Sequence, residues 1–497
     1  MKESARPTES GDPARHGVRT GARLDRRLVT LAMVVVLGTL LTTFNGTSMN
    51  VAVRTLGAEF GVSISTIQWI LTGYFLAFAA VVPVTGWAGE RFGAKRVWLG
   101  GVVLFVVASA LSGASWSAGA LITFRILEGV AAGVVVPVGQ AILARAAGAD
   151  RMGRAISLLS VPILLGSVAG PVFGGLIIST LGWRWIFYVD VPIGVLAYLV
   201  GRKMLPETEP RPATPIDLRG IVLLCGGVAS FIYGLNEVSA AGTGGTAGVT
   251  VGLAGATLLL LYLWHARARA GRAVIDLALF SNRGFATGIA AHLTLSITRA
   301  GLLAFLPLYW QVVHGASPLA AGLLVAPQAL GAVVAMPLAG RITDRFGARV
   351  VVPAGILLVL AGTAAYAQAS MPVSYPALIG AAFVIGLGVG STAAPSVASA
   401  YGALPQDAMP RGSSAINTGQ RLGASIGTAV LAIVVQGAIT TRLPGLGEAV
   451  LRPLPAATRA QIEPALASAF GLTFWVAFAL TAVALVPALM LPYKGKA

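Results

Sequence analysis

Apolar residues in this chain are grouped into long blocks separated by short polar segments, rather than alternating with polar residues as in a half-buried strand. The first block, residues 28–44, reads LVTLAMVVVLGTLLTTF. Blocks of about 20 apolar residues cross a bilayer as helices, because a helix satisfies its own backbone hydrogen bonds. The pattern predicts fourteen spans, near residues 30–52, 66–88, 97–114, 118–141, 155–178, 184–201, 218–236, 247–264, 285–310, 318–340, 350–369, 375–398, 412–435 and 469–491.

Composition changes this picture little. Only 11% of the 497 residues are charged, whereas about a quarter is typical of soluble domains. The sequence therefore predicts an all-α polytopic membrane protein. Residues 1–27 are polar and basic, and we expect a disordered tail there. Because many spans follow, we interpret the first apolar block as an uncleaved helix rather than a signal peptide. The single cysteine, Cys225, excludes an intrachain disulfide and a cysteine metal site.

The basic residues orient the spans. With the N-terminus placed inside, Arg125 and Arg299 fall within spans, and the external segments hold only Arg54, Arg184, Arg442, Arg452 and Arg459. Cytoplasmic loops carry an excess of Lys and Arg, so the even number of spans predicts both termini in the cytoplasm. The formal charge of +17 is then mostly a topology signal, and we expect no nucleic-acid partner.

A charged turn occurs twice. Residues 86–96 read GWAGERFGAKR after the second span, and residues 340–349 read GRITDRFGAR after the tenth. We interpret the two as equivalent positions in two homologous halves, which requires two inserted helices between them. The predicted segments are a six-helix half at 28–201, a linker at 202–216, an inserted two-helix hairpin at 217–264, a linker at 265–284 and a second six-helix half at 285–491.

The residue types of the turn have physical uses. Gly86 and Gly340 allow a helix to end or to pack closely. Glu90 and Asp344 place a carboxylate at a helix terminus, where it can pair with basic neighbours or with a helix N-terminus. The repeated turn also contains a second glycine, Gly93 in the first copy, and basic residues that suit a cytoplasmic surface, Arg91 and Arg345.

The fifth span contains GSVAGPVFGG at residues 166–175. Glycines four residues apart line one helix face, so that a neighbouring helix can approach closely. A proline within the run removes a backbone donor and is expected to kink the helix. The residues concerned are Gly166, Gly170, Pro171, Gly174 and Gly175.

These motifs resemble those of the major facilitator superfamily. The charged turn is similar to its signature loop, a charge relay that gates the cytoplasmic side, and residues 166–175 look like its antiporter motif. Fourteen spans resemble the drug:H⁺ antiporter branch of EmrB/QacA-type multidrug and antibiotic exporters, and the segments 183–194, 306–331 and 412–427 resemble that branch too. The resemblance implies a major facilitator fold with an inserted hairpin. It also implies proton-coupled efflux of hydrophobic or amphipathic compounds across the bacterial plasma membrane by alternating access.

The chain departs from that branch where the proton would be carried. The branch usually has an aspartate in helix 1, but this sequence has Asn45, whose amide cannot titrate, so a proton carrier at position 45 is excluded. Acids replace amides of the branch at Asp190 and at Glu128, which lies three residues after Arg125. We expect these four residues to share one polar layer in the outer half of the membrane. Our hypothesis is that Asp190 or Glu128 carries the proton.

The alternative to proton carriage is that Glu128 and Asp190 have purely structural roles. Glu128 and Arg125 face the same way on a helix and would then form a fixed ion pair, and Asp190 would be solvated near the outer interface. In the ninth span, His292 and Arg299 lie seven residues apart and share a helix face. Arg299 is expected to meet an anionic substrate group or a carboxylate, unless it snorkels or belongs to a structural pair.

A substrate cavity is expected to use polar and aromatic side chains from several spans. The candidates are Asn45, Gln68, Tyr74, His292, Arg299 and Gln328.

No nucleotide-binding loop and no catalytic, zinc or haem constellation stands out, so we expect no enzyme, cofactor or metal. The predicted function is proton-driven export by a monomer, with a hydrophobic small molecule, protons and the lipid bilayer as partners. The alternatives are a metabolite carrier, an uptake symporter, or an uncoupled transporter or sensor, because position 45 is an amide. Residues 436–468 are predicted to be an external loop.

Overall fold

The computed structural model describes residues 26–62, 64–148, 155, 158, 170, 173–207, 217–241, 246–269, 273–368, 374–443 and 456–492. Thirteen helices in this part of the chain are long and apolar enough to cross a membrane. The described residues contain no strand, and the predicted all-α polytopic fold is confirmed. The predicted tail and most of the span at 155–178 lie outside the described residues.

The first half begins with a helix that is longer than its apolar block, because polar residues after the block continue the same helix. Near Pro83 the second predicted span is interrupted by a short 3-10 turn, since proline cannot donate a backbone hydrogen bond. The elements are α1 (Arg26–Phe60), α2 (Ile64–Val81), η1 (Val82–Val84), α3 (Thr85–Phe92), α4 (Ala94–Gly113), α5 (Ala118–Ala147), a helical segment at 173–180, α7 (Trp185–Tyr188) and α8 (Asp190–Met204).

The second half begins after η4 (Leu277–Ser281). The predicted external loop at 436–468 is wrong at both ends, because α15 continues to Arg442 and α16 already begins at Ala456. The elements are α11 (Arg283–Val312), α12 (Pro318–Phe346), α13 (Ala348–Ala367), α14 (Tyr375–Gly402), η5 (Gln406–Ala408), α15 (Met409–Arg442), α16 (Ala456–Val483) and α17 (Leu485–Leu489).

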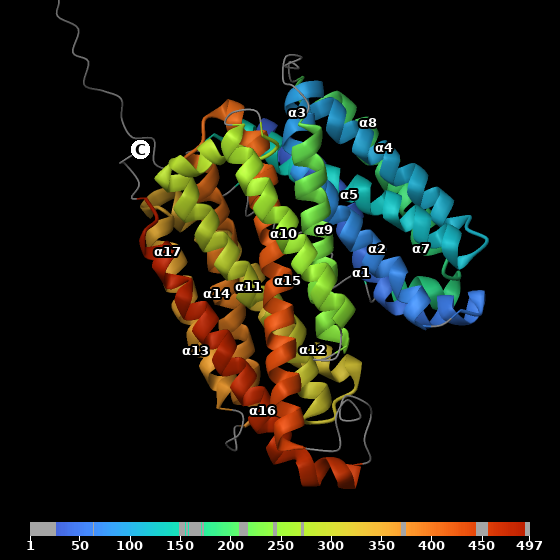
Figure 1. The fold of residues 1–497 in the computed structure, drawn as a ribbon, viewed down its shortest axis with the longest axis vertical. Helices are drawn as coiled ribbons and strands as arrows, with labels where there is room; N and C mark the ends of the chain where they lie inside the picture. The colour runs from blue at the N-terminus through green and yellow to red at the C-terminus, as the bar shows by residue number, and fades with distance from the viewer. Residues whose placement is uncertain are drawn as a thin grey trace, which may run out of the picture.

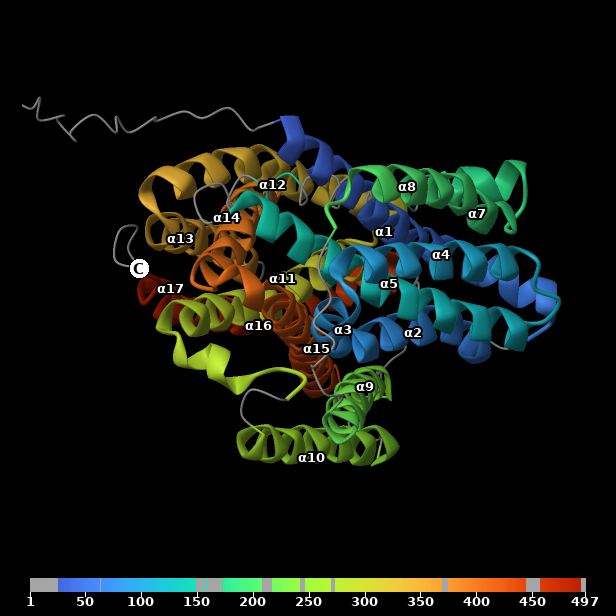
Figure 2. The ribbon, with the colours of Figure 1, turned by 90° about the horizontal axis from the view of Figure 1, so that it is seen from above.

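Between the halves run α9 (Leu218–Ala241) and α10 (Thr246–Ala268). In Figure 2 this hairpin lies at the periphery, with α9 closer to the other helices than α10. The apolar face of α9 packs on both halves, with Val228 in one buried cluster with Ala79 of α2 and Ile416 of α15. Trp69 of α2 also stacks on Tyr233 of α9, with ring centroids 5.8 Å apart. The hairpin therefore covers a seam between the halves.

The two halves contact each other at one end, which we call the charged-turn end because it carries residues 86–96 and 340–349. Figure 1 shows the two groups of helices meeting near α3 and spreading apart toward the opposite end. The beginning of α15 makes the joining contacts. Arg411 Nε lies 2.8 Å from Glu90 Oε1, and the Ser414 hydroxyl donates to the carbonyls of Val82 and Pro83 at 2.9 and 2.7 Å.

Glycines of the charged turn have two different roles. The helices end at Gly93 and Gly347, whose φ angles of 87° and 86° disfavour any residue with a Cβ atom. Gly340 does not end a helix, because α12 continues to Phe346. Gly86 permits close packing instead. A Cβ atom there would lie 2.9 Å from both the Pro410 carbonyl oxygen and the Arg411 Cα.

We predict that Gly86→Ala separates the halves at the charged-turn end. The added methyl group meets backbone, and overpacking of this kind costs about 1–3 kcal/mol. That cost shifts the balance between closed and open conformations by roughly 5- to 150-fold. Distances between spin labels on the first turns of α4 and α13 measure the shift. Gly100→Ala is the matched control, because no atom lies within 4 Å of its added Cβ. Identical distance distributions in both variants would contradict the packing role of Gly86.

Candidate functional site

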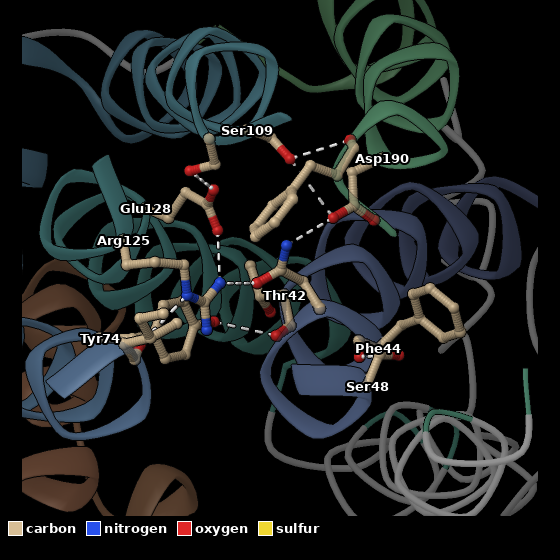
Figure 3. Close-up of polar contacts among 12 residues, drawn as sticks. Thr42, Phe44, Ser48, Tyr74, Ser109, Arg125, Glu128 and Asp190 are labelled. Atoms are coloured by element: carbon tan, nitrogen blue, oxygen red, sulfur yellow. Dashed lines mark hydrogen bonds and ion pairs between the residues drawn. The ribbon is translucent and has the colours of Figure 1, made fainter. Parts of the chain in front are cut away.

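A buried group of polar residues connects the helices of the first half. Four helices, α1, α4, α5 and α8, supply six of its members, and α2 supplies the seventh, Tyr74. Figure 3 shows Arg125 and Glu128 next to each other, with Asp190 on a separate helix. All the members are at most 2% exposed. We call this group the polar cluster; it consists of Asn45, Tyr74, Ser109, Ser112, Arg125, Glu128 and Asp190.

Asn45 is the bridge of the polar cluster. Its side-chain Nδ2 donates a hydrogen bond of 2.6 Å to Asp190 Oδ2, and its Oδ1 accepts one from Arg125. The amide therefore separates the acid on α8 from the arginine on α5 while contacting both. These contacts bring the four predicted residues together, and Asn45 lies within the polar cluster; its assignment to a substrate cavity stays a prediction.

Arg125 is surrounded by acceptors and an aromatic ring. Its Nη1 lies 2.5 Å from Glu128 Oε2, and its Nε donates to the Ile70 carbonyl at 3.2 Å. The guanidinium carbon lies 4.3 Å from the ring centroid of Tyr74, a distance at which a cation is attracted to the ring face. Nη2 has no hydrogen-bond partner among the described residues. The predicted Arg125–Glu128 ion pair is present and fully buried.

The two acids have different surroundings. Glu128 contacts the arginine and also accepts a hydrogen bond of 2.5 Å from Ser112. Asp190 accepts from Asn45 and, at 3.5 Å, from Ser109, whereas its Oδ1 has no partner among the described residues. Asp190 is 0% exposed, so the alternative of a solvated residue at the interface is wrong. Two acids and one arginine thus share the cluster, and only Glu128 forms an ion pair with the arginine in the described part of the chain.

Small residues bring these helices close enough for the contacts to form. A Cβ atom on Gly129 would lie 2.2 Å from the Tyr74 carbonyl oxygen, so α5 and α2 pack backbone to backbone. On the other side of α1, the Ser48 hydroxyl donates to the Gly170 carbonyl at 3.0 Å. A Cβ on Gly174 would also meet Ser48 at 2.9 Å. Gly175 follows on the same helical segment, and Gly166 and Pro171 lie outside the described residues.

Comparisons with known proteins agree with the helical arrangement and the motifs. The family model described as Major Facilitator Superfamily matches residues 35–428. The chain belongs to the major facilitator superfamily. Members of this superfamily are membrane transporters of small molecules rather than enzymes. The matched region includes the whole polar cluster and both charged turns.

Two bacterial relatives and one solved structure illustrate the similarity of this superfamily member. The chain is 35% identical to the multidrug resistance protein B homolog of Mycobacterium tuberculosis, over 98% of this chain and 94% of that protein. It is 30% identical to the multidrug export protein EmrB of Haemophilus influenzae, over 81% and 79%. The proton:xylose symporter XylE has the same fold, with a TM-score of 0.59 and 15% identity over 94% of this chain and 96% of that chain. These relatives and the apolar helices indicate a multi-pass protein of the bacterial inner membrane.

The second half contains a different polar group. His292 of α11 contacts Ser396 at 3.2 Å and Gln420 at 3.3 Å through its two ring nitrogens. His292 and Arg299 line one internal pocket, as their shared helix face predicts, and about 10 Å³ of it is open to the centre of a water molecule. That is room for about one water molecule.

Sequence reasoning did not single out Arg421, although this arginine lies inside the predicted span at 412–435. Because α15 begins at Met409, Arg421 lies more than three turns inside the helix. Its guanidinium carbon lies 3.9 Å from the ring centroid of Phe78 on α2, so it faces the other half of the protein. A charged residue within a predicted span is the signal that could have found it.

The other predicted residues lie elsewhere. Glu90 pairs with Arg411 near the N-terminus of α15, and the sequence did not reveal this partner. Arg91 follows Glu90 at the end of α3. Asp344 and Arg345 occupy the last turn of α12. Gln328 is 8% exposed on α12, and no described contact joins it to the other cavity candidates. The side chain of Gln68 lies outside the described residues.

We predict that Glu128→Gln destabilises the protein far more than Glu59→Gln. The first change leaves Arg125 without its buried carboxylate, and breaking a buried ion pair costs about 3–5 kcal/mol. The second breaks an exposed pair, Arg184–Glu59 at 3.4 Å, which is worth about 0–1 kcal/mol. Thermal unfolding in detergent measures both. Equal midpoints for the two variants would show that the Arg125–Glu128 pair does not hold α5 in place.

Proposed function

We propose that the chain exports hydrophobic or amphipathic compounds in exchange for protons, and that Asp190 carries the proton. The names of the multidrug relatives and the antiporter-like run at residues 166–175 support export over uptake. The observation that carries the proton assignment is the charge balance of the polar cluster. Glu128 neutralises Arg125 at 2.5 Å, which leaves Asp190 with neutral donors only in the described part of the chain.

A buried carboxylate without a cation is costly, because water no longer solvates the charge. Protonation of Asp190 removes that charge, so the closed polar cluster favours the neutral acid. The opposing influence is the position of Asp190 at the first residue of α8, since a helix N-terminus favours a negative charge. These two influences suit a group that alternates between its protonated and ionised forms.

Asn45 connects the proton to the helices. When Asp190 ionises, the hydrogen bond from the Asn45 amide strengthens, because hydrogen bonds to charged groups are stronger than those between neutral groups. The same amide accepts from Arg125, so a change at α8 is transmitted to α1 and α5. We propose that this transmission biases the two halves toward one of their two arrangements, which couples the proton to alternating access.

The proposed orientation follows the positive-inside rule, with both termini and the charged-turn end in the cytoplasm. The contacts of Arg411 and Ser414 with the first half then form a closed cytoplasmic gate, and the arrangement in Figure 1 is outward-facing. The two six-helix halves, at 28–201 and 285–491, move relative to each other, and the hairpin at 217–264 accompanies them. One chain contains both halves, so we propose that the monomer is the transporting unit.

We predict that Asp190→Asn abolishes substrate-induced proton flux and that adding Asn45→Asp restores it. The double variant exchanges the acid and the amide across the 2.6 Å hydrogen bond, so it keeps one acid, one amide and the total charge of the cluster. Proton release from acidified everted vesicles is measured after adding ethidium, a lipophilic cation, or N-phenyl-1-naphthylamine, a neutral amphiphile. A loss of at least tenfold in Asp190→Asn, recovered to near wild-type flux by the exchange, is expected.

Glu59→Gln is the control for that measurement, because its carboxylate is 46% exposed and distant from the cluster. Full proton flux in Asp190→Asn would place the carrier at Glu128 or elsewhere. Movement of either compound without proton flux in the wild type would mean an uncoupled transporter. No movement at all would favour a sensor.

A further inference from the structure

Arg299 is a partly buried cation in the middle of α11 for which the described residues provide no counter-charge. It lies about 24 Å from the first residue of α11 and about 20 Å from its last, at about 1.5 Å of rise per residue. An arginine side chain is too short to snorkel over either distance. No described carboxylate forms an ion pair with Arg299, so the alternatives of snorkelling and of a structural ion pair both fail for the described part of the chain.

The carboxylates of the second half lie near the membrane surfaces. At the charged-turn end are Asp344 in the last turn of α12 and Asp407 in η5. Asp276, which precedes this half, lies at the same end, 3.7 Å from Arg411. At the opposite end Glu463 lies 3.3 Å from His314. In the first half, Glu128 is already paired with Arg125. Among the described residues, the middle of the second half therefore has cations and no acid.

The surroundings of Arg299 correspond to those of the polar cluster. The pocket that it lines is formed by residues of α11, α13, α14 and α16, which are the first, third, fourth and sixth long helices of their half. The polar cluster uses α1, α4, α5 and α8, which hold the same places in the first half. There a carboxylate neutralises Arg125, whereas the Arg299 pocket has hydroxyl groups and an imidazole instead.

A second side chain in this pocket is also unpartnered. Thr298 lines the pocket and is only 3% exposed. Its hydroxyl has no hydrogen-bond partner among the described residues, although buried hydroxyls almost always have one. Ser296 and Thr392 also line the pocket, but their hydroxyls donate to the carbonyls of Leu293 and Val389. A cation beside an unpartnered hydroxyl donor in a low-dielectric space is a favourable environment for a small anion.

The charge around the pocket favours the same occupant. Arg421 on α15 is close enough to repel Arg299 electrostatically, and its guanidinium rests on Phe78 without a described carboxylate. His292 lines the same pocket and contacts neutral groups only among the described residues. An anion at Arg299 would relieve the repulsion between the two arginines and would supply the missing partner of Thr298.

We propose that Arg299 and the Thr298 hydroxyl form a binding site for a monovalent anion inside the second half. The occupant is a halide from the medium or the anionic end group of an exported compound. The space open to the pocket, about 10 Å³ for the centre of a water molecule, suits a single ion or a terminal carboxylate. The site is tested by binding and therefore stands or falls independently of proton coupling.

The experiment measures the thermal midpoint and the anion affinity of the purified protein. Chloride is compared with gluconate at equal ionic strength, since gluconate is too large for the pocket. Chloride is expected to raise the midpoint of the wild type, because a ligand that binds the folded state stabilises it. Arg299→Gln is expected to weaken chloride binding by at least tenfold, and Thr298→Val by a few-fold. Arg299→Lys retains the charge and is expected to retain most of the binding.

Arg421→Gln serves as the matched cation control, because Arg421 does not line the pocket and its removal is expected to cost less than removal of Arg299. 1-Naphthoate and the neutral 1-naphthamide distinguish the two sources of the anion. Competition with chloride by naphthoate alone identifies an end-group site, and no competition by either identifies a halide site. The proposal would be overturned if Arg299→Gln or Thr298→Val bound chloride and naphthoate as tightly as the wild type does.

Discussion

The cost of placing charge in a water-free interior is the constraint on which this structure depends. Arg125 is 0% exposed and remains charged, so its surroundings have to supply a carboxylate, a carbonyl and an aromatic face. Glu128, Ile70 and Tyr74 meet these needs from two helices. Asn45 and Asp190 then extend the network to α1 and α8. In the mechanism that we propose, this network links the arrangement of four helices in the first half to the protonation of Asp190.

The two halves meet the same constraint in different ways. The first half contains both acids of the membrane interior that the described residues include, and one of them neutralises the arginine. The second half contains Arg299 and Arg421 near hydroxyls, an imidazole and a ring. A transporter that exchanges a proton for another solute needs sites whose charge depends on occupancy. We propose that Asp190 and the Arg299 pocket, in corresponding places of the two halves, are such sites.

Much of the fold was predictable, because long apolar blocks leave few alternatives to spanning helices. The repeated turn also indicated two halves, since the charges of a membrane surface alone do not explain the repeated order of residues. Helix ends were less predictable. Hydropathy placed the end of α15 too early and the beginning of α16 too late, because residues 436–442 and 456–468 are also helical. Helix formation beyond the bilayer does not require apolar side chains. Arg421 lay within the predicted span at 412–435, but its contact with Phe78 of the other half was not predictable from the sequence.

The site was predictable as far as the residue types allowed. An amide at position 45 with acids at 128 and 190 indicated a displaced carboxylate, and helix spacing indicated the Arg125–Glu128 pair. The bridging role of Asn45 was not predictable, because it depends on the distance between α1 and α8 and on the direction of a side-chain amide. The pairing of Glu90 with Arg411 likewise requires knowing that α15 starts beside α3.

The most direct test of the account is infrared difference spectroscopy of the purified protein, which detects the carbonyl stretch of a protonated carboxylic acid. Spectra at acidic and neutral pH would be compared for the wild type, Asp190→Asn and Glu128→Gln. The account predicts a protonated-acid band that disappears in Asp190→Asn and persists in Glu128→Gln. A band that persists in Asp190→Asn and disappears in Glu128→Gln would contradict it, because the proton would then reside on the acid that is paired with Arg125.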